Sequence, residues 1–482
     1  MSFLQKLSAS IVIVLFTTII VLDLFVHPEY SFDDSPYFEY RGLLFGLALV
    51  LGAVLVFASI MKLGKLLYWN PILPILFYII ASLAFLWAVP MVPVSDQAAV
   101  FFLASNRLVD PFNYMSTYSN TIPTIMYLFA LVSVFGNSLW VPKIANVVWG
   151  LMTLILTAKV YGLLAPDGLT RRERAKLFFS EAECKLLWIG ADFLPAFFYN
   201  NHVYNEVPSV ALGMLLLYLV VRNDDKIWLR IITVIVSFLQ MSLRQTGVIL
   251  IIAVAMYIFF YQKKRIYAIV YLACSILGYF LIAKCCGLLL VDAETQGFPI
   301  WSWVKMGINE AEIGFQDNTH SYDVTFQDVV DRYQEYGLYK VLTILGRKTF
   351  WIWGEGTYQS GRYGYGVLNN EYLYETFVTA RLSESPDRIL RVTTNFVLRA
   401  QYLFYMLFAL LGTLRAQKKN EFSVLFYIFC GFLVFYLVWE IKSRYLYGLY
   451  PMFMILALYG WESDENPVRK IPGLIKNRAP SK

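Results

Sequence analysis

Long apolar segments follow one another through most of this chain, and they limit its fold more than any other feature. Each approaches the roughly 20 residues that a helix needs to cross the hydrocarbon core of a bilayer. Only 15% of the residues are charged, and the mean hydropathy is +0.56 over 482 residues. Because unpaired backbone polar groups are costly in lipid, spanning segments of this kind form helices. The sequence therefore predicts an all-α, polytopic membrane helix bundle.

The candidate spans cover residues 8–26, 42–60, 71–91, 121–136, 141–163, 186–204, 207–221, 227–243, 246–262, 266–290, 396–414, 421–439 and 445–460. The segment at 121–136 is short for a span and could instead be a re-entrant or juxtamembrane helix. We therefore expect about 11 to 13 spans.

Lysine and arginine gather in some loops and avoid others, which predicts sidedness by the positive-inside rule. The basic loops are 61–70, 164–185, 222–226, 263–265 and 415–419, together with the C-terminal tail, and we expect these on the cytoplasmic side. The acidic or neutral loops are 27–40, 92–120, 200–206, 244–245, 291–395 and 440–444, and we expect these outside. Two candidate spans separate loop 92–120 from loop 164–185, so either one of them does not cross or the latter loop breaks the charge rule.

This reading divides the chain into four parts. Residues 1–70 hold additional N-terminal spans, and residues 71–290 form a transmembrane module whose first outer loop is 92–120. Residues 291–395 form a long outer loop that is rich in aromatic residues and glycine, with an amphipathic helix over 326–350 that is broken or bent at Gly337. Residues 396–482 hold the last spans and a basic tail.

The first outer loop contains the most informative acidic residue. Asp96 follows the outer end of span 71–91 and opens an expected interfacial helix. A carboxylate in such a place suits a general base. The structural alternative is equally simple, because Ser95 or Asp96 before a helix is an ordinary N-cap.

Three further outer loops carry polar and charged groups between apolar segments. Loop 200–206 offers Tyr204 and Glu206, which suit a sugar or a head group, although a solvated loop would look the same. Arg244 lies in a tight turn at the membrane boundary, where ionisable residues are often functional and a guanidinium binds phosphate in a bidentate way. Snorkelling toward an anionic lipid is the alternative for Arg244.

The last of these loops and the long loop complete the candidate site. Glu440, Lys442 and Arg444 lie together on the predicted outer side, where cations need an anionic partner such as a phosphate or Glu440 itself. Lys305 follows Trp301 and Trp303, which suit an aromatic belt at the membrane interface.

The sequence motifs of several common enzyme classes are absent from this chain. The chain has no P-loop, no dinucleotide-binding glycine motif and no metalloprotease or hydrolase motif in a suitable context. A sugar donor would therefore reach the site within the membrane. The net charge of +6 is spread over loop ends, so we expect no nucleic-acid partner.

The order of the spans and outer loops along the chain resembles that of the GT-C superfamily of membrane glycosyltransferases. The similarity covers about residues 70–460, and it is greatest to the branch of polyprenyl- or dolichyl-phosphate-dependent protein O-mannosyltransferases and aminoarabinose transferases. It rests on VSDQAAVFFLASN, on NYMSTYSNTIPTIMYLFALVSVFG with the following VPKIANVVWGL, and on a long late outer loop. LRQTGVILIIA and EIKSRYLYGLYP add weaker similarity. The chain departs from the pattern in keeping only the first acid of the pair, Asp96-Gln97, and in its two extra N-terminal spans.

The resemblance implies a GT-C-like bundle with juxtamembrane helices and an inverting transfer from a polyprenyl-phosphate sugar. It implies that Asp96 deprotonates an acceptor hydroxyl, and that Arg244, Lys442 and Arg444 bind the phosphate. Tyr204, Glu206, Glu440 and Lys305 would bind the sugar or the acceptor, which could be a lipid, a glycan or a protein. We expect no cofactor or metal ion, because the leaving phosphate monoester carries less charge than a pyrophosphate would, although a divalent metal is not excluded.

Three other functions compete with this one. A ligase or polymerase of lipid-linked glycans would use the same cations but would not need Asp96. A transporter or flippase for such glycans would need charges at mid-depth and broken helices in paired halves, whereas the charges here lie mostly at span ends. A scaffold is favoured only if the polar groups do not converge. We expect an integral protein of a bacterial plasma membrane, in contact with membrane lipids and with its site on the outer face.

Overall fold

The fold is described from a computed structural model. It describes residues 3–30, 36–64, 70–89, 91–93, 95–111, 113–165, 179–288, 297–315, 321–360 and 386–462. The basic cluster at residues 171–176, residues 65–69 of loop 61–70 and the C-terminal tail after residue 462 lie outside these ranges. The predicted sidedness of those segments therefore stays a prediction.

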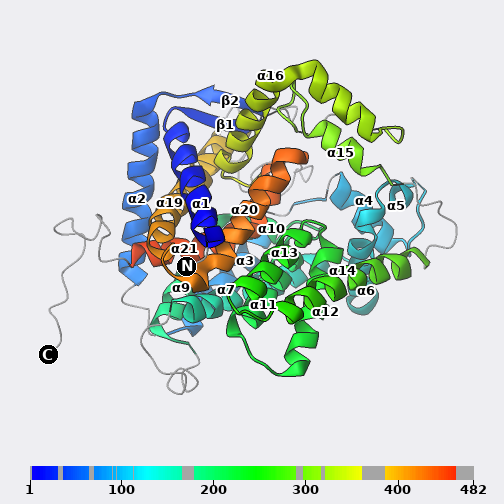
Figure 1. The fold of residues 1–482 in the computed structure, drawn as a ribbon. Helices are drawn as coiled ribbons and strands as arrows, with labels where there is room; N and C mark the ends of the chain where they lie inside the picture. The colour runs from blue at the N-terminus through cyan, green and yellow to red at the C-terminus, as the bar shows by residue number, and fades with distance from the viewer. Residues whose placement is uncertain are drawn as a thin grey trace.

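Helices make up most of the described chain (Figure 1). They are α1 Phe3–Asp23, α2 Leu43–Gly64, α3 Ile72–Ala88, α4 Asp96–Ser105, α5 Tyr114–Thr117, α6 Ile122–Phe135, α7 Trp140–Leu164, α9 Glu181–Ala191, α10 Leu194–Tyr199, α11 Glu206–Arg222, α12 Ile227–Leu243, α13 Gly247–Phe260, α14 Arg265–Leu288, α15 Ile300–Met306, α16 Phe326–Gly354, α19 Pro386–Ala416, α20 Ser423–Val438 and α21 Tyr450–Trp461. Short 3₁₀ segments are η1 Ser119–Thr121, η3 Asn420–Phe422 and η4 Ser443–Leu449. Strands β1 Val26–Tyr30 and β2 Pro36–Tyr40 form an antiparallel hairpin.

Five helical segments are long and apolar enough to cross a membrane. They lie in α1, α7, α14, α19 and the segment Asn420–Val438, and five shorter apolar helices accompany them. Helix α14 leaves large apolar side chains such as Leu277 and Phe280 more than 60% exposed, as lipid contact allows. These features agree with an all-α membrane helix bundle, while the count of about 11 to 13 spans stays a prediction.

Helices α19 and α21 pack very closely in the core of the bundle. A Cβ atom on Gly412 would collide with the carbonyl oxygen of Leu456, and one on Gly460 with that of Phe408. Glycine therefore lets these two backbones touch, as small residues do between membrane helices. Rings of Phe16, Phe429 and Phe453 fill the space beside them, with centroids 5.0–5.3 Å apart.

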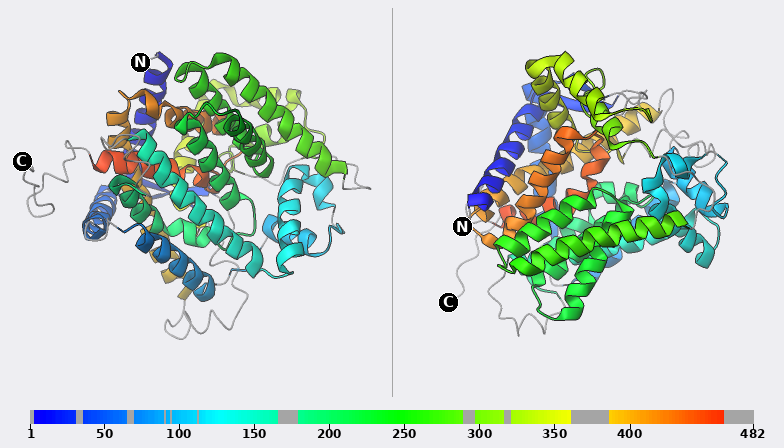
Figure 2. Two further views of the ribbon diagram at one scale, coloured as in Figure 1. Left: turned by 90° about the horizontal axis from the view of Figure 1, so that it is seen from below. Right: turned by 45° about the vertical axis from the view of Figure 1, so that its right-hand side comes forward.

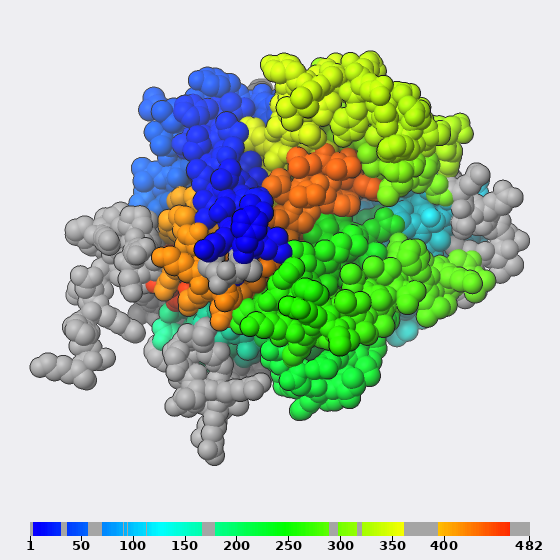
Figure 3. All heavy atoms as spheres, in the orientation of Figure 1, coloured from blue at the N-terminus to red at the C-terminus, as the bar shows by residue number. Residues whose placement is uncertain are grey.

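Helices α4, α5 and α6 form a group on one side of the molecule, away from α1 and α2 (Figures 1 and 2). Helix α15 and the first half of α16 lie over the end of α20 (Figure 1). In Figure 3, α20 is visible between α16 and the region of α12–α14. The bend predicted at Gly337 is confirmed, because this residue has a left-handed φ of 66° inside α16.

Two expectations about local structure were wrong, and a third segment has a fold that the sequence did not predict. The predicted span 186–204 is two short helices, α9 and α10, because Pro195 in the first turn of α10 cannot continue a preceding helix. The long loop ends earlier than predicted, since α19 begins at Pro386 rather than near residue 396. The loop 27–40 contains the β1–β2 hairpin, which Arg399 of α19 anchors through an ion pair with Glu29 at 3.0 Å.

Candidate functional site

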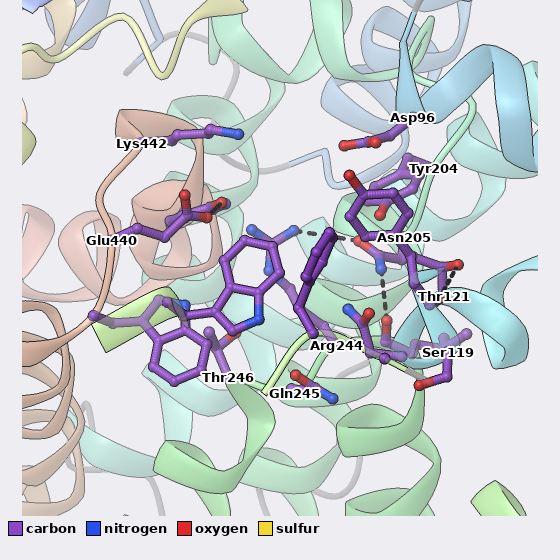
Figure 4. A pocket seen from close by; sticks show the side chains of 18 of the residues that line it. Asp96, Ser119, Thr121, Tyr204, Asn205, Arg244, Gln245, Thr246, Glu440 and Lys442 are labelled. Carbon is purple, nitrogen blue, oxygen red and sulfur yellow. Dashed lines mark hydrogen bonds between the residues drawn. The ribbon is translucent and has the colours of Figure 1, made fainter. Parts of the chain in front are cut away.

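The predicted site residues converge on one cavity of about 350 Å³ (Figure 4). This volume lies within the range of about 300–1,000 Å³ that is typical of ligand pockets. The lining comes from loop 96–121, the start of α11, the α12–α13 turn, segment 297–303 and the chain between α20 and η4. Seven of the eight predicted site residues line it: Asp96, Tyr204, Glu206, Arg244, Glu440, Lys442 and Arg444.

Asp96 lines this cavity and is the first residue of α4. Ser95 before it makes no side-chain cap hydrogen bond. The Asp96 carboxylate accepts a hydrogen bond from the Tyr114 hydroxyl at 3.2 Å and lies 3.7 Å from a guanidinium nitrogen of Arg444. Asp110 fixes the intervening turn, since its carboxylate accepts from the backbone N–H groups of Tyr114 and Met115. The side chain of Asp96 stays 35% exposed, so a ligand can reach it.

Glu206 and Arg244 form a buried ion pair at the base of the cavity, 3.1 Å apart. Asn205 also accepts from Arg244, at 3.4 Å, and its amide donates to the Leu243 carbonyl at 2.6 Å. Burial acts to raise the pKa of the Glu206 carboxyl, but the charges of Arg244 and Arg444 outweigh it and leave the pKa lowered. Glu206 is therefore ionised and serves as the counter-ion of Arg244.

The segment between α20 and η4 supplies the opposite wall. Figure 4 shows Lys442 and Asp96 on opposite sides of the cavity with their charged ends toward each other. The Tyr445 hydroxyl donates to one oxygen of Glu440. The other oxygen of Glu440 and the Tyr436 hydroxyl, both buried, have no hydrogen-bond partner among the described residues. Both residues line the cavity.

The cavity balances its charges. Its lining holds three acidic side chains, Asp96, Glu206 and Glu440, and three basic ones, Arg244, Lys442 and Arg444, so the formal sum is zero. Because Glu206 neutralises Arg244, an anionic ligand would find its cations chiefly on the 442–444 side.

Aromatic rings form much of the remaining wall. Tyr114 and Tyr118 lie 4.9 Å apart, Phe298 lies 5.7 Å from Tyr118, and Trp303 stacks on Trp439 at 6.2 Å between ring centroids. Burial raises the pKa of the Tyr114 hydroxyl well above its usual range, so it stays a neutral donor. The sequence did not single out Trp439, Tyr436 or Tyr445, because only the fold brings these rings beside the first outer loop.

Lys305 was wrongly placed in the site. Its ammonium lies 3.8 Å from Asp328, outside the cavity lining. On α15, Ile300 and Trp303 line the cavity. A residue two positions after Trp303 is turned by about 200° around the helix, so Lys305 faces away.

Within the described part of the chain, no group of three or more His, Cys, Asp or Glu side chains is placed to hold a metal ion. The site therefore consists of three acidic and three basic side chains between aromatic walls. In comparisons with protein-family models, curated proteins and solved structures, nothing matches this chain.

Proposed function

We propose that this protein is an inverting glycosyltransferase of the GT-C type. It moves a sugar from a polyprenyl-phosphate donor to an acceptor hydroxyl at the outer face of a bacterial plasma membrane. The observation that carries the proposal is the meeting of Asp96, from the first long loop, with Lys442 and Arg444, from the last one, across a single cavity. An apolar bundle around that cavity suits a donor that arrives in the lipid phase.

Asp96 acts as the general base in this proposal. Its carboxylate takes the proton of the acceptor hydroxyl, and the acceptor oxygen forms a bond to the anomeric carbon. The bond from that carbon to the phosphate oxygen breaks on the opposite side, so the configuration inverts. The electron pair leaves with the polyprenyl phosphate. General-base catalysis of this kind contributes about 10²–10⁴-fold to the rate.

Lys442 and Arg444 stabilise the leaving phosphate. Negative charge grows on it during the reaction, and preorganised cations in a site shielded from water are effective against such charge. Arg444 also lies 3.7 Å from Asp96, so it can hold the base and the leaving group in one arrangement. In this proposal the two cations neutralise the charge of the leaving phosphate, so the transfer needs no metal ion. That the reaction is independent of metal stays a prediction.

The aromatic and acidic walls suit the sugar. The Trp303–Trp439 pair offers flat apolar surface to a pyranose face, and Tyr204 lies beside Asp96 (Figure 4). The unpartnered oxygen of Glu440 and the Tyr436 hydroxyl can each bond a sugar hydroxyl. A site with such buried polar groups rejects a ligand that leaves them unpaired.

The test is a transfer assay with the full chain in lipid nanodiscs. Radiolabelled polyprenyl-phosphate sugars are supplied in a panel, with membrane extract as the acceptor source. We expect one donor to give label transfer that falls about 100-fold or more in Asp96→Asn. Asp331→Asn, at an exposed acid on α16, is the matched control and is expected to behave as wild type. Transfer from a donor at equal rates in wild type and Asp96→Asn would refute the role of Asp96.

A ligase or polymerase of lipid-linked glycans is the second candidate. The position of Arg244 and Arg444 in one cavity favours it, because two guanidinium groups suit a pyrophosphate, although Glu206 already pairs with Arg244. Transfer from a lipid-pyrophosphate glycan, with no transfer from any monophosphate donor, would establish this alternative.

A further inference from the structure

Among the described residues, Lys348 is the most deeply buried cation that the proposed transfer does not use. It lies in the second half of α16, and its side chain has no solvent-exposed surface. Its ammonium donates to the carbonyl oxygens of Gly307, of Trp439 at 2.7 Å and of Leu437 at 3.3 Å. A buried charge is costly unless it is hydrogen-bonded, and here all three of its protons have acceptors.

These three carbonyls are the ends of two helices. Gly307 follows the last residue of α15, whereas Leu437 and Trp439 flank the last residue of α20. The final carbonyls of a helix lack partners within it and carry partial negative charge, so a cation there is favourable. One ammonium therefore caps two helices that come from distant parts of the chain.

The same contact joins two walls of the cavity. Helix α15 contributes Ile300 and Trp303 to the lining, and the end of α20 contributes Tyr436, Trp439 and Glu440. The approach is so close that a Cβ atom on Gly307 would collide with the Val438 carbonyl oxygen. The Ile441 N–H donates to the Gly314 carbonyl at 2.9 Å and continues the junction toward Lys442.

We propose that Lys348 is a positioning residue: by holding the C-terminal ends of α15 and α20 together, it sets the wall that carries Trp303, Trp439 and Glu440. Lys348 does not itself line the cavity. The inference rests on the proposed function only for its effect on catalysis, because the junction itself is a property of the fold.

The test uses the full chain in nanodiscs, labelled with 5-fluorotryptophan. The signals of Trp303 and Trp439 are assigned by Trp→Phe substitution among the twelve tryptophans. We expect Lys348→Met to shift or broaden these two fluorine signals, since the rings would no longer stack as in wild type. Lys340→Met is the matched control, because Lys340 lies on the same helix but pairs with Glu310 at the surface. It should leave both signals in place.

Gly307→Ala tests the same junction from its other side without altering the lysine. The added methyl group should separate α15 from α20 and disturb the same two signals, even if Lys348→Met does not fold. If Gly307→Ala leaves both signals as in wild type, or if a folded Lys348→Met does so, the proposal is overturned.

Kinetics then test the catalytic consequence. A misplaced wall should lower kcat/KM in Lys348→Met by about 10- to 100-fold, while Lys340→Met stays near wild type. A purely structural role would reduce the yield of folded protein but leave its kcat and KM unchanged. A wild-type protein that transfers no sugar would refute the proposed function, and the fluorine signals would still decide whether Lys348 forms the junction.

Discussion

Glu206→Gln removes one charge from the buried pair with Arg244, and its effect follows from the geometry. At 3.1 Å and an effective dielectric constant of about 20, the attraction between the two charges is about 5 kcal/mol. The side chains are only 2% and 15% exposed, so solvent screens this attraction little. Breaking a buried pair on one side leaves the other charge uncompensated, which costs about 3–5 kcal/mol of unfolding free energy.

A double-mutant cycle measures this coupling. Thermal unfolding in mild detergent is followed for wild type, Glu206→Gln, Arg244→Gln and the double variant. We expect the double variant to be more stable than the sum of the two single losses predicts, because it leaves no unpaired charge. Asp225→Asn, which removes a pair with Arg230 at the surface, is the control and should hardly change Tm. Strict additivity of the two single losses would refute the ion pair.

Further predictions concern pH, helix packing and the hairpin. Burial lowers the pKa of the His202 imidazole to about 4. As pH falls, the unfolded chain therefore binds a proton at this residue before the folded protein does. The contribution of neutral His202 to the unfolding free energy is complete above pH 6.5 and is lost as pH falls toward 4, a change of about 3 kcal/mol. Wild-type Tm should therefore fall over this pH range, and His202→Gln should lack this fall. Gly412→Ala should lower Tm through overpacking of about 1–3 kcal/mol, whereas Gly52→Ala, which meets open space, should not. Arg399→Met should cost about 3–5 kcal/mol, measured as a lower midpoint of unfolding, because it leaves Glu29 without this partner.

The helices could be predicted because their signal is local. Apolar runs such as the one that became α7 contain the information for a helix within themselves, and the bend at Gly337 follows from the glycine. The break before α10 was missed because hydropathy averages over Asp192 and Pro195 within an apolar window.

The site could be predicted only in part. The positive-inside rule placed Asp96 and Lys442 in loops expected on the same side, which was enough to suggest convergence. Pairing is a property of three-dimensional contact, so the sequence did not show that Glu206 would neutralise Arg244. It also gave no sign of Lys348, whose three carbonyl partners lie 41, 89 and 91 residues away.

The most direct test of the account is an experimental structure of the protein with an unreactive donor analogue, a polyprenyl phosphonate sugar, in nanodiscs. The account predicts that the phosphonate oxygens lie within about 4 Å of the Lys442 and Arg444 nitrogens. It predicts that the anomeric carbon of the sugar faces Asp96 and that the ring lies against Trp303 and Trp439. A phosphonate bound elsewhere, with this cavity holding no sugar, would contradict it.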